Sequence, residues 1–283
     1  MESTKCGVKV RYKAFLPHRG ILQISGEDRA TFLQGLITND VRKVTPTQTL
    51  YAVLLTPQGR FLYDFFISEQ GGAYLLETEV ERLPELLQKL TFYKLRSRVV
   101  LTPRPDLAVY ALWGQDLDSP LEDVFVDPRL SELGFRGRGK GPAVPFQTAS
   151  LEDYNRHRLH LGVPEGGVDL IPEKSIPLEC GLDELNAIDW EKGCYMGQEL
   201  TSRTKFRGLV RKRLFPVKIK GTPPPFGATV FKNEKDVGSM RSSAGGYGLA
   251  LLRLESLQES GEFTCEGAIL APFQPAWLVI DNT

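Results

Sequence analysis

The sequence predicts an α+β protein that ends in a small all-β module. Three observations support this prediction: a strand–turn–strand pattern over residues 51–67, a helical pattern of leucines from 83 to 90, and an alternating, turn-rich pattern beyond residue 207. Their order suggests a unit with an antiparallel sheet, followed by strands of a compact β module. The chain has 283 residues, more than one hydrophobic core usually organises, so we expect two or three domains.

The first elements lie before residue 41. Residues 21–24 read as a short strand. Ser25 and Asp28 have the spacing of a helix-opening cap, and apolar residues from 32 to 36 provide one face of the helix that follows. The polar sequence TND at residues 38–40 is predicted to end this helix.

A hairpin is the clearest local signal. Residues 51–55 (YAVLL) and 60–67 (RFLYDFFI) are strand-like and enclose TPQG, in which proline and glycine occupy favoured turn positions. Further strands are expected at residues 74–77, 98–101, 109–112 and 124–126, with a helix carrying Leu83, Leu86, Leu87 and Leu90.

The remaining patterns mark the domain boundaries. The glycine-rich sequence RGRGKGP at 136–142 is predicted to be a flexible turn, because it contains no phosphate-binding motif. Ser150 and Asp153 repeat the helix-start signal, and this helix extends through Leu161. Strands of the last module are expected at 214–219, 228–231, 248–252 and 277–280, and pattern changes place boundaries near residues 47, 145 and 208.

The composition is that of an ordinary soluble globular protein, with 41% hydrophobic and 25% charged residues. Thirty-five basic and 35 acidic residues cancel, which counts against a protein that coats nucleic acid or anionic membranes through its net charge. No apolar stretch approaches the roughly 20 residues that span a bilayer. The first residues resemble neither a secretory signal nor a presequence, so we expect a bacterial cytoplasmic chain, or a mitochondrial matrix chain without its presequence.

The four cysteines, Cys6, Cys180, Cys194 and Cys265, are far apart and form no C-x-x-C pair. This spacing disfavours a zinc ribbon or a self-contained iron–sulfur ferredoxin. Reduced thiols in a reducing compartment are the simpler interpretation.

The most informative segment is KGCYMGQE at residues 192–199. Its two glycines permit close backbone approach or a positive φ, and a thiol and an aromatic ring lie between them. Lys192 would lower the pKa of the Cys194 thiol if the two groups are close. A free cysteine is most often a small buried hydrophobe, but these polar neighbours do not suit an apolar core.

With Arg203 four residues further on, this octapeptide resembles the signature of the YgfZ-type folate-binding iron–sulfur maturation proteins, which are relatives of the aminomethyltransferase (T protein) of the glycine cleavage system. Other segments follow the family's order: FLQGLITND at 32–40, LTPQGR at 55–60, FYKLR at 92–96, PLE at 177–179 and GLA at 248–250. The resemblance therefore extends along most of the chain.

The resemblance implies an aminomethyltransferase-like ring of three domains around a folate channel. The first domain would be split between residues 1–46 and 146–207, a ferredoxin-like domain would be inserted at 47–145, and a C-terminal β-barrel would occupy 208–283. The ring comes from the resemblance alone, whereas the boundaries come from the pattern changes in the sequence.

The resemblance also assigns roles to single residues. Cys194 would face the folate channel as a reactive thiol, or ligate a transient [2Fe-2S] cluster shared with a partner, since such a cluster usually needs four protein ligands. Glu179 corresponds to the carboxylate that accepts hydrogen bonds from the pterin edge of tetrahydrofolate. Lys192, Tyr195 and Arg203 would complete the folate-binding set.

The implied function is that of a tetrahydrofolate-binding protein that assists assembly or repair of iron–sulfur clusters, especially the [4Fe-4S] type. An A-type iron–sulfur carrier and iron–sulfur client enzymes are the implied partners. The alternative is a folate-dependent one-carbon (aminomethyl) transferase with Asp64 as a catalytic residue. The aminomethyltransferases have an Asp-Asp pair in this hairpin, whereas Tyr63-Asp64 retains only one carboxylate, so classical aminomethyl transfer is not expected.

A basic stretch follows the octapeptide. Residues 203–213 contain six basic residues and no acidic one: Arg203, Lys205, Arg207, Arg211, Lys212 and Arg213. The stretch is compatible with a solvated strand edge, with binding of the glutamyl carboxylates of folate, or with contact to an acidic partner or nucleic acid. The neutral net charge counts against nucleic acid.

Overall fold

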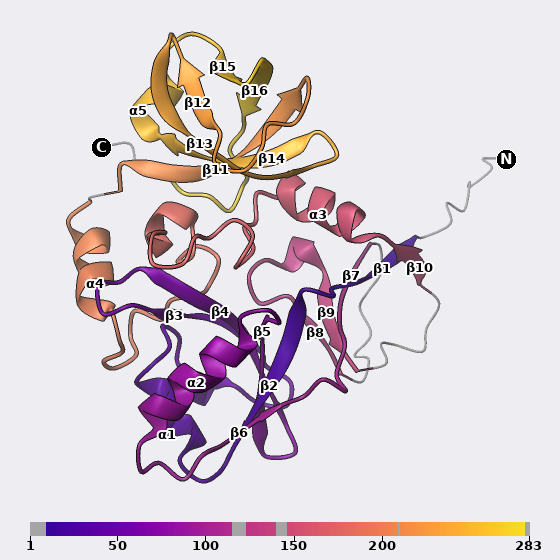
Figure 1. Ribbon diagram of the computed structural model, residues 1–283, viewed down its shortest axis with the longest axis vertical. Coiled ribbons are helices and arrows are strands. Elements are labelled where there is room, and N and C mark those ends of the chain that lie inside the picture. The colour runs from indigo at the N-terminus through magenta and orange to yellow at the C-terminus, as the bar shows by residue number, and fades with distance from the viewer. Residues whose placement is uncertain (1–9, 115–122, 140–145, 209, 281–283) are drawn as a thin grey trace, which may run out of the picture.

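Two open sheets and a closed barrel organise the protein (Figure 1). A computed structural model describes residues 10–114, 123–139, 146–208 and 210–280. The first sheet has the order β10 (Gln147–Ala149), β1 (Arg11–Phe15), β7 (Val109–Gly114), β9 (Phe135–Arg138) and β8 (Val124–Val126). The second sheet has the order β3 (Leu50–Leu55), β4 (Phe61–Gln70), β5 (Ala73–Glu79), β2 (Arg19–Ser25) and β6 (Val100–Pro103).

The C-terminal barrel is confirmed. Its closed order is β11 (Lys212–Lys220), β14 (Tyr247–Arg253), β13 (Lys235–Ala244), β12 (Thr229–Lys232), β15 (Phe263–Cys265) and β16 (Ala268–Pro272). The strand expected at 277–280 is wrong, because these residues form a turn and an irregular segment after β16. Trp277 and Leu278 nevertheless pack against the barrel core, which explains the apolar pattern that suggested a strand.

Short helices cover the sheets and join them to the barrel. They are α1 (Arg29–Gln34), α2 (Leu83–Lys94), α3 (Leu151–His160), α4 (Gln198–Phe206) and α5 (Leu254–Gln258), with 3₁₀ turns η1 (Val41–Lys43), η2 (Ser131–Leu133) and η3 (Pro177–Cys180). In Figure 1, α1 and α2 lie over the second sheet, α3 lies between the first sheet and the barrel, and α4 runs along one side below the barrel. In the described part of the chain no helix has the length and apolarity needed to cross a membrane.

The two predicted helix starts differ in outcome. Ser150 and Asp153 form a reciprocal capping box at the start of α3, as the sequence predicts. At α1 the predicted cap does not form: the N-cap is Asp28, and its side chain makes no capping hydrogen bond. The Asp28 carboxylate instead accepts a hydrogen bond from the backbone N–H of Arg98 at 2.7 Å, which ties α1 to the segment before β6.

The pairing of strands cuts across the expected domain boundary near residue 47. β1 and β2 both precede this point, yet β1 pairs with β7 and β10, whereas β2 pairs with β5 and β6. Each open sheet therefore combines strands from both sides of the boundary. The division into 1–46 with 146–207, 47–145 and 208–283 stays a prediction.

The predicted hairpin of β3 and β4 is confirmed and supports the site. Every residue of β3 is buried, because the strand is covered on both faces, and its sequence is accordingly a continuous apolar run rather than an alternating one. Ala52 and Leu54 belong to the core under α1 and α2, whereas Val53 and Leu55 face a second core that contains Tyr195. The hairpin thus packs against the octapeptide through Tyr195.

The glycine-rich segment predicted as a flexible turn is instead partly a strand. Residues 135–138 form β9, and Arg136 is buried between the two open sheets, where it pairs with Glu77 of β5. Glycine suits position 137 in this strand, since a Cβ there would lie 3.1 Å from a methyl group of Leu112 and would require that side chain to move. Residues 140–145 of the predicted turn lie outside the described residues.

Candidate functional site

Lys192 anchors the octapeptide to the segment that follows α1. The Lys192 ammonium is buried and donates to three backbone carbonyl oxygens, those of Gln34 (2.8 Å), Ile37 (2.5 Å) and Asn39 (2.8 Å). Burial lowers the pKa of Lys192 to about 8, while the charge of Asp40 opposes this shift. Because all three donors are engaged, Lys192 holds the loop in place and has no free donor for a ligand.

Two polar residues of the FLQGLITND segment complete this anchor. The Thr38 hydroxyl donates to the carbonyl of Ala187 at 2.6 Å and accepts from the N–H of Val53 at 2.9 Å. The Asn39 amide donates to the carbonyls of Tyr51 and Asn186, each at 2.8 Å. The sequence marks TND as the end of a helix and as part of a family motif, and neither of these two roles is predicted from it. Through Lys192, the octapeptide and the FLQGLITND segment are joined by hydrogen bonds in the folded protein.

Cys194 is exposed, and its thiol is free. Neighbouring Gly193 faces open space, so nothing among the described residues covers the loop at this point. Gly197 ends the loop with φ +83°, and a Cβ there would lie 2.5 Å from the carbonyl oxygen of Thr56. A side chain at 197 is therefore excluded both by conformation and by the hairpin turn below it. The loop therefore packs against the β3–β4 hairpin at Gly197 and is exposed to solvent at Cys194.

The Tyr195 side chain lies in the protein interior, away from the surface where Cys194 is exposed. Its ring is buried in the core that includes Val53, Leu55 and Leu178, and the Lys192 ammonium lies 5.2 Å from the ring centroid. Burial raises the pKa of Tyr195 to about 12. Its described environment is that of an anchor for the loop, and its predicted folate contact stays a prediction.

Glu179 lies on η3, where the second sheet, the octapeptide helix and the barrel meet. Its carboxylate is partly buried and makes no hydrogen bond with any described residue. Burial raises the pKa of Glu179, and the positive charges of Lys212, Arg60 and Arg241 oppose that rise. This carboxylate is therefore an acceptor without a hydrogen-bond partner among the described residues, and it feels the positive charges of residues in β11, in β13 and in the turn before β4. Neighbouring Cys180 is buried, which raises the pKa of its thiol to about 12 and makes it unreactive.

Asp64 lies in β4 with no exposed surface. One carboxylate oxygen accepts from Arg19 at 2.9 Å, and the other accepts from Tyr51 and from the N–H of Gly166, each at 3.3 Å. Gly166 is required here because a Cβ would lie 2.5 Å from the carboxyl group. Arg19 also pairs with Glu77, which in turn binds Arg136. The candidate catalytic carboxylate is thus a member of a closed ionic cluster.

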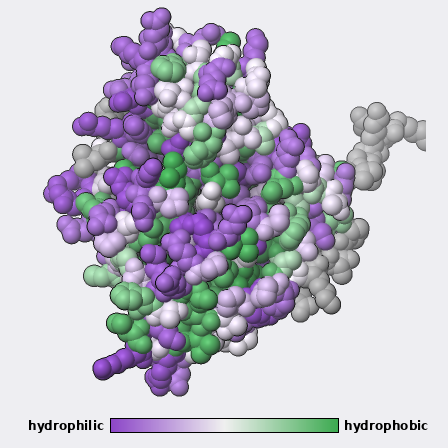
Figure 2. Space-filling model, viewed as in Figure 1, coloured by the Kyte–Doolittle hydropathy of each residue, from purple (hydrophilic) through white to green (hydrophobic). Residues whose placement is uncertain are grey.

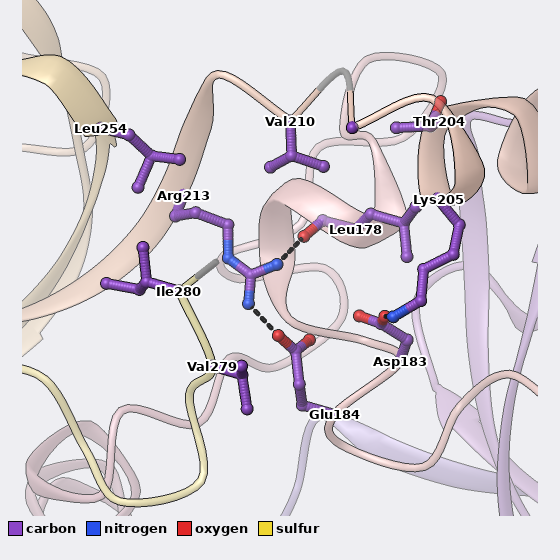
Figure 3. A pocket seen from close by; sticks show the side chains of 11 residues that line it. Leu178, Asp183, Glu184, Thr204, Lys205, Val210, Arg213, Leu254, Val279 and Ile280 are labelled. Atoms are coloured by element: carbon purple, nitrogen blue, oxygen red, sulfur yellow. Dashed lines mark hydrogen bonds and ion pairs between the residues drawn. The ribbon is translucent and has the colours of Figure 1, made fainter. Parts of the chain in front are cut away.

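The basic stretch is divided among different surroundings. Arg203 is half-exposed on α4 and pairs with Glu199 at 3.6 Å, so the structure brings it to the surface and away from the buried anchor. Arg213 is buried, donates to the carbonyl of Leu178 at 2.7 Å and pairs with Glu184 (Figure 3). Arg213 and Lys205 both line a cavity of about 270 Å³ between η3, α4 and the start of the barrel, where Lys205 binds Asp183 at 2.8 Å. These residues form no continuous basic surface.

The structure therefore separates the predicted site into four places. Lys192, Cys194 and Tyr195 belong to one loop. Glu179 lies near the barrel, Arg203 lies at the surface of α4, and Asp64 is buried between the sheets. Among the described residues no group of three or more histidine, cysteine or acidic side chains is placed to hold a metal ion.

Comparison with known proteins places the chain in a family. Residues 211–279 match the family model "CAF17, C-terminal beta-barrel domain". The mouse protein "Iron-sulfur cluster assembly factor IBA57, mitochondrial" is 37% identical, over 86% of this chain and 78% of the mouse protein. The human protein of the same name is 36% identical over the same shares. The chain belongs to the IBA57 family.

The fold of this IBA57 relative is that of the aminomethyltransferases. A crystal structure of the glycine cleavage system aminomethyltransferase T from Bartonella henselae superposes with a TM-score of 0.78, covering 95% of this chain and 87% of that one. The two sequences are 16% identical, so the likeness shows the fold. The predicted fold class is confirmed: an aminomethyltransferase-like α+β fold with a C-terminal β-barrel.

Proposed function

We propose that the protein binds tetrahydrofolate and assists assembly or repair of iron–sulfur clusters, especially those of the [4Fe-4S] type. The observation that carries this proposal is the exposed, uncovered thiol of Cys194 on a loop that Lys192 fixes at its base. Membership of a family whose named relatives are iron–sulfur cluster assembly factors supports it. The cluster is the cargo of this activity.

A cluster held through Cys194 would be shared with a second protein. Two-iron clusters need four ligands, and one thiolate supplies only one of them. The partner we propose is an A-type iron–sulfur carrier, which would provide the remaining thiolates and pass the cluster on to client enzymes. An exposed thiol suits this sharing because a partner can reach it, and the anchored loop holds it at a fixed place on the surface.

Tetrahydrofolate fits the surroundings of Glu179. The adjacent N–H donors of a pterin match the two oxygens of a carboxylate that has no hydrogen-bond partner among the described residues. The nearby charges of Lys212, Arg60 and Arg241 oppose the rise in the pKa of Glu179 and so favour the ionised carboxylate that this recognition needs. In this scheme Glu179 orients the pterin. Arg203, which is half-exposed, would act from the surface of α4.

Classical aminomethyl transfer has less support in the structure. A general base must reach the proton that it removes. Asp64 has no exposed surface, and its two oxygens already accept hydrogen bonds from Arg19, Tyr51 and Gly166. The surroundings of Asp64 are those of a structural ion pair.

The thiol is tested by mixing the reduced protein anaerobically with a cluster-loaded A-type carrier and recording visible circular dichroism. We expect a new cluster spectrum with the wild-type protein and none with Cys194→Ser. Cys180→Ser is the matched control, because that thiol is buried and should not contribute. An unchanged spectrum with Cys194→Ser would contradict the proposed role of Cys194.

The folate site is tested by calorimetric titration with tetrahydrofolate under reducing conditions. We expect Glu179→Gln to weaken binding at least tenfold, because the amide replaces one acceptor oxygen by a donor. Glu173→Gln is the control, since Glu173 is exposed on the preceding turn. Equal affinity of wild type and Glu179→Gln would remove Glu179 from the site. If the wild-type protein does not bind, the folate part of the proposal fails.

A further inference from the structure

The outer face of α4 combines an exposed aromatic ring with positive charge. Phe206 is 78% exposed at the end of the helix, and Leu200 on the first turn is also exposed. Residues 198–211 contain four basic residues and one acidic residue. Figure 2 shows that this edge of the molecule is mainly hydrophilic. A large apolar side chain projecting from a charged surface is typical of an interaction site.

The cations of this face differ in how far they are engaged. Lys205 is bound to Asp183, and Arg203 forms a long, exposed pair with Glu199. Arg207 and Arg211 are exposed and form no ion pair with any other described residue. Of these two cations, Arg207 is the C-cap of α4 and directly follows Phe206, and Arg211 lies just before β11. Their charge is available to acidic groups of another molecule.

This face is continuous with the Cys194 loop. The Phe206 ring packs edge-on against Trp190 with centroids 6.0 Å apart, and Trp190 lies four residues before Cys194. Gln198, the first residue of α4, lies four residues after Cys194. A helix of this length extends roughly 13 Å, so its exposed end lies within the footprint of about 800 Å² per partner that a standard interface covers around the thiol.

We infer that the outer face of α4 is the docking surface for the protein that shares the cluster at Cys194, and that this partner presents an acidic surface with an apolar pocket for Phe206. The inference rests on the proposed function and specifies the chemistry of its partner. Arg207 and Arg211 attract the partner and orient it, and Phe206 holds it once it is bound.

One other surface and one other class of partner fit this role less well. The C-terminal end of α2 exposes Phe92 and Leu95, and hydrophobic side chains gather over that part of the molecule (Figure 2). The neighbouring Lys94 and Arg98 are engaged by Val99 and by Glu27 and Asp28. Arg96 is exposed there without an ion pair to any described residue, so this patch offers one such cation where the segment after α4 offers two. A nucleic acid would need a longer basic track than this one helix end provides.

The docking surface is tested by measuring binding of the cluster-loaded A-type carrier with surface plasmon resonance. For Arg207→Glu/Arg211→Glu we expect an association rate at least tenfold lower at 50 mM salt, with the difference shrinking at 300 mM. For Phe206→Ala we expect a dissociation rate at least tenfold higher. Phe92→Ala is the matched control, because that ring is 75% exposed on α2.

Each outcome bears on a different proposal. All substituted side chains are exposed, so thermal unfolding should be unchanged and loss of binding is not a loss of fold. If the wild-type protein binds the carrier but the α4 variants bind equally well, the docking surface is wrong and the proposed function stands. If the wild-type protein does not bind it, both fail. Competition by a 20-nucleotide RNA that depends on Arg207 and Arg211 would overturn the acidic protein partner.

Discussion

The surroundings of Asp64 and of Cys194 differ in almost every physical respect. Asp64 lies between two sheets, and Arg19, Tyr51 and Gly166 occupy both of its oxygens. Cys194 lies at the surface beside a glycine that faces open space. The Asp64 carboxylate is buried and paired with Arg19. The Cys194 thiol is exposed, on a loop that Lys192 anchors through hydrogen bonds. The hairpin carboxylate of Asp64 is therefore part of the internal structure, whereas the thiol of Cys194 is accessible on its loop.

The largest expected loss of unfolding free energy comes from removing the buried carboxylate of Asp64. Asp64→Ala leaves the buried Arg19 guanidinium without one of its two carboxylate partners, which should cost about 3–5 kcal/mol of unfolding free energy. Urea denaturation measures this loss. Cys194→Ser, an exposed substitution, should stay within about 0.5 kcal/mol of wild type. Equal costs at the two positions would remove the distinction between them.

Loss of the anchor at the base of the loop should come next. Lys192→Met leaves three buried carbonyl oxygens without a donor, and we expect a loss of roughly 2–4 kcal/mol. Amide hydrogen exchange of residues 193–199 should accelerate together with this loss. Lys43→Met is the control, since Lys43 makes only an exposed pair with Asp189 and should cost under about 1 kcal/mol. Unaltered exchange in Lys192→Met would show that the loop is held by other contacts.

Alanine substitutions at the two glycines of the octapeptide should differ in their cost in unfolding free energy. Gly197→Ala forces a side chain into a left-handed conformation and against the Thr56 carbonyl, so we expect a loss of about 1–3 kcal/mol. Gly193→Ala should be nearly neutral, because an added Cβ meets nothing there. Thermal unfolding of both variants checks this difference. A larger loss at 193 than at 197 would contradict the view that the loop is seated at its second glycine.

The smallest effect concerns pH. Burial raises the pKa of Glu79 to about 7, with a further contribution from the nearby charge of Asp64. Because the folded state then holds this proton more tightly than the unfolded chain, the associated stability is complete below about pH 4.5 and is lost as pH rises to about 7. Glu79→Gln should flatten the unfolding free energy measured between pH 5 and 8. An identical pH profile in wild type and Glu79→Gln would contradict this assignment.

Local signals in the sequence predicted local structure well. The hairpin around residues 56–59, the capping box at Ser150 and the barrel strands β11, β12 and β14 were predicted from residues close together in the chain. Local signals were wrong for a cap at Ser25 and for a strand at 277–280. The octapeptide correctly marked an exposed cysteine between two glycines. The aminomethyltransferase-like fold followed from the order of several motifs, and the comparisons confirm it.

What the sequence could not predict depends on contacts between distant residues. Lys192 was expected beside the thiol or the folate, but its partners are carbonyl groups more than 150 residues earlier, and backbone acceptors leave no signal in a sequence. The glycine-rich segment that begins at Arg136 predicts a turn, whereas Arg136 lies in a buried strand and pairs with Glu77. The role of Asp64 depended in the same way on Arg19 and Gly166.

The anchor at Lys192 also has a consequence for how the protein is made. Its acceptors lie at Gln34, Ile37 and Asn39, so they leave the ribosome long before their donor does. Until residue 192 has been synthesised, these carbonyl groups depend on water. The thiol loop therefore takes its final position only after most of the two open sheets has been translated, and the nascent chain does not present Cys194 in its functional setting until its scaffold exists.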